Sequence, residues 1–355
     1  MLVKLNSIII YALAAFFLAL IAYPPYIALL RKLKIGKTIR ETAMTGEKAV
    51  NFIELHKHKS GTPNLGGWMF LIIMAIMIAI ARGLQHYGII NNSLVAREET
   101  YIILFGFFTM GFLWLIDDIL NVIGHGKMKW LSAHAKLIGM FLFAGFISRW
   151  FYGRLDIDYI NLRPIAGKVS IGIFAPIVTF FVTISIVNAI NITDGLDGLA
   201  WGLMILVLWT LAALTFFYGT YIATTVIAIL IAVLVAFLRY NINPAKIFMG
   251  DSGAFAIGGL LSSLLFILNM RIGILVPFTF LFIIFITEIG SVALQLISKK
   301  IRKRKIRTVA PLHHHYEKTW LAETHIVMKA WLIQGIVAAV TIITLFYQFN
   351  MKLLP

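Results

Sequence analysis

The sequence predicts an all-α polytopic integral membrane protein that crosses the bilayer ten times. Of its 355 residues, 60% are hydrophobic and only 13% are charged, which is more apolar surface than the core of a soluble domain can bury. Apolar runs long enough to cross a hydrocarbon core, which takes about 20 residues of helix, recur from one end of the chain to the other. We therefore expect residues 1–355 to form a single transmembrane domain.

The expected spans follow one another with short loops between them. They lie near 7–29, 65–82, 101–116, 132–151, 169–190, 200–217, 221–238, 254–269, 274–297 and 330–349. The first resembles the apolar part of a signal peptide, but it is longer and lacks a small-residue cleavage site, so we expect it to remain as a helix. Between the fourth and fifth spans, polar and apolar residues alternate from Asp156 to Lys168, which favours a short β-hairpin. The absence of cysteine excludes disulfides and thiolate chemistry.

The distribution of basic residues predicts the orientation in the membrane. The loops after the first and ninth spans hold two basic groups: Arg31, Lys32, Lys34, Lys37, Arg40, Lys48, Lys57 and Lys59, and Lys299, Lys300, Arg302, Lys303, Arg304, Lys305 and Arg307. Basic residues collect in cytoplasmic loops, so the odd-numbered loops are expected inside, with the hairpin and both termini in the periplasm. Because topology accounts for the net charge of +16, no nucleic-acid partner is expected.

The remaining polar motifs lie in the same odd-numbered loops. These loops cover about 31–64, 117–131, 191–199, 239–253 and 298–329, and they carry acids, amides, imidazoles and glycines. Since all of them face one aqueous surface in the predicted topology, they indicate a composite active site on the cytoplasmic side.

Each motif has a functional and a structural interpretation. Asp117 and Asp118 place two carboxylates where a helix leaves the membrane, which favours a hard divalent cation such as Mg²⁺ over simple capping. The segment Asn191–Gly198 can bind a polar ligand or simply form turns. The stretch Lys59–Gly67 puts a cation and small residues before a helix, where phosphate binds, but it can also be a plain loop. The run His313–His315 can move protons, bind phosphate or ligate metals, or be solvated surface.

Together these motifs resemble a known family over nearly the whole chain. They are Lys59-Ser60-Gly61-Thr62-Pro63 with Gly66-Gly67, Asp117-Asp118, Asn191-Ile192-Thr193-Asp194-Gly195-Leu196-Asp197-Gly198, Phe248-Met249-Gly250-Asp251 and Pro311-Leu312-His313-His314-His315-Tyr316-Glu317. In this order they resemble the polyprenyl-phosphate N-acetylhexosamine-1-phosphate transferase superfamily. The triple-histidine segment is similar to the corresponding segment in the branch that transfers phospho-N-acetylmuramoyl-pentapeptide.

The resemblance implies an enzyme of the bacterial inner membrane, commonly a homodimer, with its active site facing the cytoplasm. It would join UDP-N-acetylmuramoyl-pentapeptide to undecaprenyl phosphate with Mg²⁺, giving lipid I and UMP in the first membrane step of peptidoglycan synthesis. Asp251 would be the principal Mg²⁺ ligand. Of Asp117 and Asp118, one would be a further ligand and the other the base for the lipid phosphate, and the resemblance does not say which is which. Direct attack by the lipid phosphate is favoured over a covalent aspartyl intermediate.

The resemblance also implies roles for residues outside the aspartates. The catalytic set would include His313, His314 and His315. Substrate would be bound by Lys59, Thr62, Lys136, Asn191, Asp194, Leu196, Asp197, Asn241, Phe248 and Gln295. The sequence departs from the family pattern at Asn121, where the family usually has a lysine, and we expect Lys127, Lys129 or Lys136 to supply that charge.

Two other functions stay open at the level of the sequence. A related transferase that uses UDP-N-acetylglucosamine would keep the same Mg²⁺ and uridine residues. A membrane transporter would also be polytopic and basic, and Glu288 lies within the ninth span, where a buried acid is normally functional. Transporters, however, place polar sites near the midplane and commonly contain internal repeats, whereas nearly all the acids here sit at the expected cytoplasmic helix ends and the sequence shows no repeat.

Overall fold

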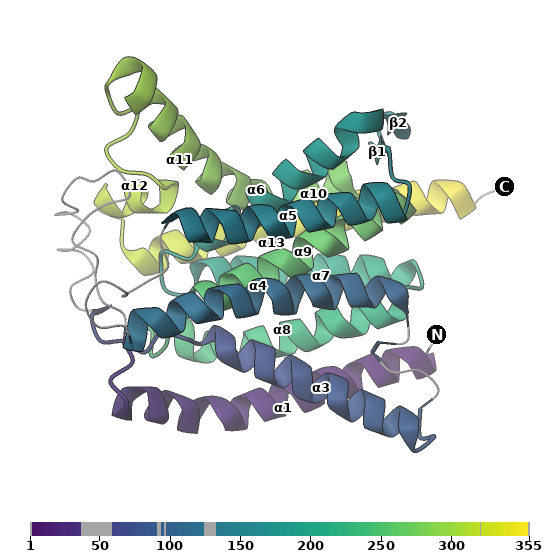
Figure 1. The fold of residues 1–355 in the computed structure, drawn as a ribbon, viewed down its shortest axis with the longest axis horizontal. Coiled ribbons are helices and arrows are strands. Elements are labelled where there is room, and N and C mark those ends of the chain that lie inside the picture. The colour runs from purple at the N-terminus through teal and green to yellow at the C-terminus, as the bar shows by residue number, and fades with distance from the viewer. Residues whose placement is uncertain are drawn as a thin grey trace.

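The computed structural model describes residues 2–36, 59–90, 94–95, 97–123, 133–319 and 321–353. Its long helices are α1 (Leu2–Lys32), α3 (Gly67–His86), α4 (Glu98–Ile123), α5 (Ala133–Arg154), α6 (Ala175–Thr193), α7 (Leu199–Phe217), α8 (Tyr221–Asn241), α9 (Asp251–Ile272), α11 (Ile283–Arg302) and α13 (Glu323–Leu353). Its short elements are β1 (Tyr159–Asn161), β2 (Lys168–Ser170), a 3-10 turn (Gly172–Phe174), α10 (Leu275–Leu281) and α12 (Leu312–Lys318). Most of the long helices run side by side in an elongated bundle (Figure 1).

Nine of the ten expected spans each coincide with one helix, and the span 274–297 falls on two, which confirms a largely helical, multi-pass architecture. Among the described helices, eight are long and apolar enough to cross a membrane, and the bent pair α10 and α11 makes up to nine. The fourth expected span is helix α5, which falls short because His134, Lys136 and Arg149 lie along it. A count of ten spans therefore stays a prediction that depends on α5.

The expected span 274–297 is broken into two helices. Helices α10 and α11 meet at Phe282 with a bend of 74°, and α11 leans away from the bundle (Figure 1). A break in an apolar environment leaves backbone groups in need of partners. Next to the break, the side-chain amide of the buried Gln334 donates to the carbonyl oxygen of Leu281 at 2.9 Å. Helix α13 thus supplies a polar group at the bend.

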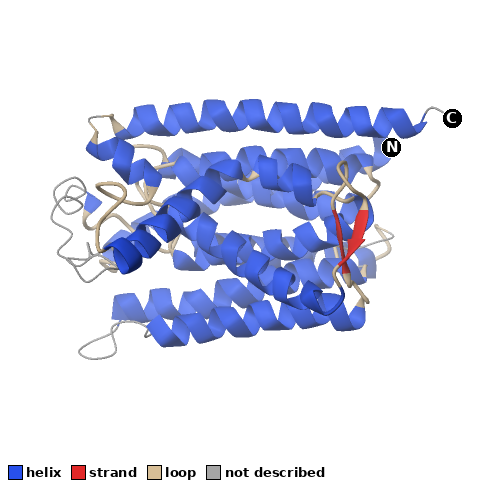
Figure 2. Cartoon of the chain, turned by 90° about the horizontal axis from the view of Figure 1, so that it is seen from above, coloured by secondary structure: helices blue, strands red, loops and turns tan. Residues whose placement is uncertain are grey.

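The two ends of the bundle differ in what they carry. Both termini and the strands β1 and β2 lie at one end, and α12 lies at the other (Figures 1 and 2). The antiparallel hairpin pairs Tyr159 with Ser170 and Asn161 with Lys168, so the predicted β-hairpin is confirmed. The side of the membrane that each end faces stays a prediction.

Close helix packing brings the ends of α4 and α9 together. A Cβ atom built on Gly106 of α4 would lie 2.4 Å from the carbonyl oxygen of Gly259 of α9, so both positions require the small residue. One helical turn past Gly111, Trp114 stacks on Phe255 with ring centroids 3.9 Å apart. Since the two helices run in opposite directions, this packing sets the carboxyl end of α4 beside the amino end of α9.

We expect Gly67→Ala to destabilise the protein by about 1–3 kcal/mol, because overpacking a tight interface displaces its backbone. A Cβ atom at Gly67 would lie 2.3 Å from the backbone nitrogen of Gly253. The matched control is Gly83→Ala in the same helix, where a Cβ atom meets nothing within 4 Å. Thermal unfolding in detergent measures both, and equal melting temperatures for the two variants would contradict the packing argument.

Candidate active site

Three aspartates and a lysine meet where α4 ends and α9 begins. Asp117 and Asp118 lie near the end of α4, and Asp251 is the first residue of α9. The Lys136 ammonium, reaching across from α5, lies 2.5 Å from Asp117 Oδ2 and 3.7 Å from Asp251 Oδ2. Asp117 is fully buried, whereas the Asp251 side chain is 36% exposed. The acidic cluster is therefore reached from solvent at Asp251.

Backbone and amide donors orient two of these carboxylates. The backbone N–H of Ser252 donates to Asp118 Oδ2 at 2.9 Å, so the first turn of α9 holds the end of α4. The Asn191 amide, in the last turn of α6, donates to Asp251 Oδ1 at 3.1 Å. Gly250 has φ +81°, and a Cβ atom there would come within 3.0 Å of Asp118 Oδ2. The glycine permits both the positive φ and the close approach.

The acidic cluster has the oxygen donors that a hard divalent cation prefers. In the described part of the chain, no three His, Cys, Asp or Glu side chains form a ready-made metal cluster. Here the positive charge between Asp117 and Asp251 is the ammonium of Lys136. Among the predicted ligands, Asp251 is the most accessible, and Asp118 is committed at one oxygen to Ser252.

A second charged cluster lies around Lys59, which begins the described segment before α3. The Lys59 ammonium is 2.7 Å from Asp197 Oδ1 and 2.5 Å from Glu323 Oε1. Asn243 donates to Asp197 Oδ2 at 3.1 Å, and so does the backbone N–H of Ala245 at 3.0 Å. This cluster connects the loops before α3, between α6 and α7 and between α8 and α9 to the start of α13.

Other predicted substrate-binding residues hold these loops together. Asn241 accepts a hydrogen bond from the backbone N–H of Gly198 at 3.1 Å and donates to the carbonyl oxygen of Ile247 at 2.9 Å. The backbone of Phe248 donates to Pro63 O and accepts from Gly66 N, both at 2.8 Å. The remaining predicted residues lie in the same loops. Thr62 lies in the turn after Lys59, and its backbone N–H donates to Lys59 O. Asn191 is in the last turn of α6, Asp194 caps that helix, and Leu196 is buried in the α6–α7 loop.

The buried acid Glu288 holds the start of α12, which carries His313–His315 and is called the histidine helix below. Its Oε2 accepts hydrogen bonds from the backbone N–H of Leu312 at 2.9 Å and of His313 at 3.4 Å, and it lies 3.0 Å from His313 Nδ1. With Glu288 ionised, its carboxylate only accepts, and His313 Nδ1 would then be the donor in this contact. His313 Nε2 then faces Gly195, where a Cβ atom would lie only 2.2 Å away. Glu288 thus presses α12 against the α6–α7 loop.

The rings of His313 and His314 lie with their centroids 4.3 Å apart, but the three histidines have different hydrogen-bond partners. His314 Nδ1 lies 2.9 Å from Glu317 Oε2, and His315 Nδ1 lies 3.1 Å from Thr308 Oγ1. The nearby Gln295 is occupied by loop backbone: its amide donates to Arg307 O at 2.8 Å and accepts from Ile306 N and Arg307 N at 3.1 Å. Gln295 therefore stabilises the basic loop after α11 through these backbone hydrogen bonds.

Most of these loops were expected to lie together on one face, but several contact partners were not expected from the sequence. The role of Glu288 was left open, and Ser252, Asn243 and Glu323 carried no predicted role. An acid at the start of a helix, such as Glu323, was a signal, but only for capping. Lys127 and Lys129, expected as replacements for the missing lysine at Asn121, lie outside the described residues, as do the loop portions 37–58 and 124–131.

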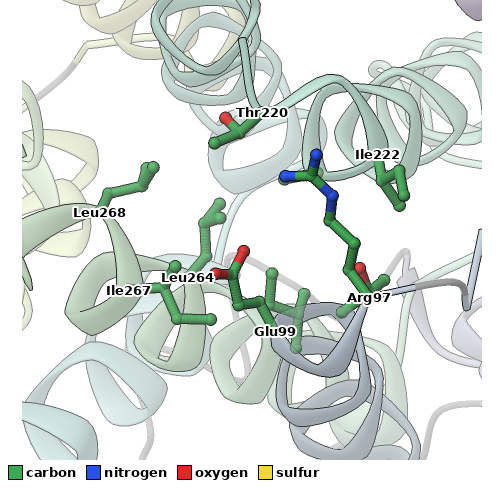
Figure 3. A pocket seen from close by; sticks show the side chains of 10 residues that line it. Arg97, Glu99, Thr220, Ile222, Leu264, Ile267 and Leu268 are labelled. Atoms are coloured by element: carbon green, nitrogen blue, oxygen red, sulfur yellow. The ribbon is translucent and has the colours of Figure 1, made fainter. Parts of the chain in front are cut away.

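A small pocket lies at the far end of α4 and α9. Figure 3 shows the side chains of Arg97 and Glu99 beside Thr220, with Leu264 and Leu268 as apolar walls. Glu99 pairs with Arg271. Glu99 and Asp117 lie 18 positions apart on one helix, which corresponds to about 27 Å. This pocket is therefore separate from the charged clusters.

Comparison with known proteins agrees with the arrangement of the site. The model of Glycosyl transferase family 4 matches residues 100–269. Proteins named phospho-N-acetylmuramoyl-pentapeptide-transferase are similar over nearly the whole chain. The one from Clostridium novyi (strain NT) is 32% identical over 96% of this chain and 97% of its own length. The one from Thermoanaerobacter sp. (strain X514) is 35% identical, covering 97% and 98%.

The chain belongs to the phospho-N-acetylmuramoyl-pentapeptide-transferase family. A third member, from Staphylococcus carnosus (strain TM300), is 33% identical over 92% of this chain and 95% of its own length. Membership of this family confirms the resemblance drawn from the five motifs. It also supports an enzyme over a transporter, since the relatives are named as transferases.

Proposed function

We propose that this protein transfers phospho-N-acetylmuramoyl-pentapeptide from UDP-N-acetylmuramoyl-pentapeptide to undecaprenyl phosphate, giving lipid I and UMP. The observation that carries the proposal is the meeting of the acidic cluster, the Lys59 cluster and the histidine helix α12 at one end of a transmembrane bundle. Family membership supports the choice of substrate, because the relatives are named for it.

The proposed reaction is a direct displacement at phosphorus. An oxygen of the lipid phosphate attacks the sugar-linked phosphorus, the bond between that phosphorus and the bridging pyrophosphate oxygen breaks, and UMP leaves with that oxygen. Both reactants are anionic, so catalysis consists of positioning them and neutralising their charge. Lys136 and Lys59 are the buried or half-buried cations that face the carboxylates in the described part of the site.

We propose that Asp251 and Asp118 hold Mg²⁺ in the working enzyme, with Asp117 beside them. When bound, the ion would neutralise negative charge on the phosphate oxygens. The protein contributes the orientation of its ligands: Asn191 holds Asp251, and Ser252 holds Asp118. Asp117, buried and paired with Lys136, is the carboxylate best shielded from water, and we assign it the role of base toward the lipid phosphate.

The membrane arrangement follows the same proposal. The end that carries α12 and the basic residues after α11 would face the cytoplasm, where the nucleotide substrate is soluble, and the hairpin and termini would face the periplasm. The location would be the bacterial inner membrane, and the chain would act as a homodimer. Surrounding lipids would contact the exposed apolar side chains of α1 and α11, such as Ile21 and Leu294.

The proposal is tested by UMP release from the purified protein with undecaprenyl phosphate and Mg²⁺. UDP-N-acetylmuramoyl-pentapeptide and UDP-N-acetylglucosamine are offered in separate reactions. Release with the muramoyl substrate alone is expected. Release with the N-acetylglucosamine substrate alone would move the protein to the neighbouring branch, and no release from a folded sample with either would refute the proposed activity.

A further inference from the structure

The carboxylate of Glu323 lies in a cradle of three donors. Its Oε1 accepts from the Lys59 ammonium at 2.5 Å and from the backbone N–H of Asp197 at 2.6 Å. Its Oε2 accepts from the Asn243 amide at 3.3 Å. One oxygen of Glu323 therefore fixes both a lysine side chain and the backbone of the loop between α6 and α7.

The same donors also hold the side chain of Asp197. Its Oδ1 shares the ammonium with Glu323, and its Oδ2 shares the Asn243 amide with Glu323. Side-chain exposure is only 8% for Lys59, 2% for Asp197 and 12% for Glu323. Charge-assisted hydrogen bonds this well shielded from water are stronger than exposed ones and restrict the groups that they join. Glu323 thus makes Lys59 and Asp197 one rigid unit.

Glu323 is not needed to dock α13. Eight residues further along that helix, Trp331 donates from its indole nitrogen to Gly198 O at 3.2 Å. Its ring also lies against Gly202, where a Cβ atom would come within 2.1 Å of it. This packing joins α13 to the start of α7 independently of the carboxylate. A variant at Glu323 is therefore expected to keep the bundle and to lose the local order of Lys59 and Asp197.

We propose that Glu323 is a positioning residue for nucleotide binding, which acts by holding Lys59 and Asp197 in the geometry that receives the uridine nucleotide. The inference rests on the proposed function for the identity of the ligand. A free lysine side chain loses considerable rotamer freedom when it is ordered by a ligand. Glu323 orders the ammonium in advance, so that binding the nucleotide carries a smaller entropic cost.

The test is calorimetric binding of UMP to the full chain in detergent, with Glu323→Ala, Glu323→Gln and the wild type compared. Glu323→Ala is expected to raise the Kd for UMP about tenfold, which corresponds to about 1.4 kcal/mol. Glu323→Gln keeps an oxygen acceptor without the charge, so its Kd is expected to rise only about threefold, since neutral hydrogen bonds are weaker. In turnover assays, the KM for the nucleotide substrate rises and kcat stays within about twofold.

The matched control is Glu99→Gln, which removes a carboxylate paired with a cation at the other end of α4 and is expected to leave the Kd unchanged. A purely structural role of Glu323 would instead lower kcat and the number of binding sites, with an unchanged Kd, and that result would overturn the proposal. Tighter UMP binding by Glu323→Ala would overturn it too, as would no UMP binding by the wild type. Wild type that binds UMP but releases none from the muramoyl substrate would refute the proposed function alone, and the Kd series would still decide the role of Glu323.

Discussion

Asp251→Ala is expected to lower Mg²⁺-dependent UMP release at least about a hundredfold, the loss typical of removing one group that stabilises transition-state charge. Asp251 is the most exposed member of the acidic cluster and the one that Asn191 orients. Lys136 keeps its closer contact, at 2.5 Å, with Asp117, so the change is expected to remove a ligand without unfolding the site. The rate of UMP release across a Mg²⁺ titration measures the effect.

The control for this variant is Asp158→Ala in the hairpin region at the other end of the bundle. Asp158 accepts a hydrogen bond from Ser170 Oγ at 3.3 Å and has no contact with the acidic cluster. It should retain wild-type turnover and the same Mg²⁺ dependence. If Asp251→Ala also retained full Mg²⁺-dependent turnover, the assignment of Asp251 as the principal ligand would be wrong.

The helices were predictable because length and hydrophobicity alone decide where a chain can cross a membrane. The break at Phe282 was not, because the proline of this span, Pro277, lies five residues before the break and the residues next to Phe282 are apolar. The bend lies beside a distant helix, α13, whose Gln334 donates to the carbonyl of Leu281. A single sequence does not reveal such long-range compensation.

The sequence predicted which loops meet at the site, but it predicted few of the contacts between individual residues. A common aqueous face brought Asp117, Asp118 and Asp251 together correctly as a group. Lys59 and Glu323, however, are 264 positions apart, and nothing in the local pattern of either residue points to the other. Asn241 and Gln295 show the converse case. Their amides were expected to bind substrate, and in the structure both bond to loop backbone.

Glu288→Ala is expected to destabilise the protein by about 3 kcal/mol and to lower UMP release sharply. The change leaves His313 Nδ1 and the backbone N–H groups of Leu312 and His313 without their acceptor. Each buried polar group that loses its partner costs about 1–3 kcal/mol. Glu288→Gln keeps one oxygen acceptor and is expected to lose less on both measures. Thermal unfolding and the UMP assay on the same detergent-solubilised samples give the two quantities.

The neighbour Thr287 provides the control, because it is exposed on the same helix and its hydroxyl donates to Ile284 O within α11. Thr287→Ala should match the wild type in both assays. If Glu288 anchors α12, the loss of turnover should follow the order Ala, Gln, wild type, in parallel with the loss of stability. A Glu288→Ala protein with unchanged melting temperature but no turnover would show that Glu288 acts on the reactants themselves. That result would contradict the anchoring role, because the loss of an acceptor by three donors, two of them buried, is expected to lower the stability of the fold.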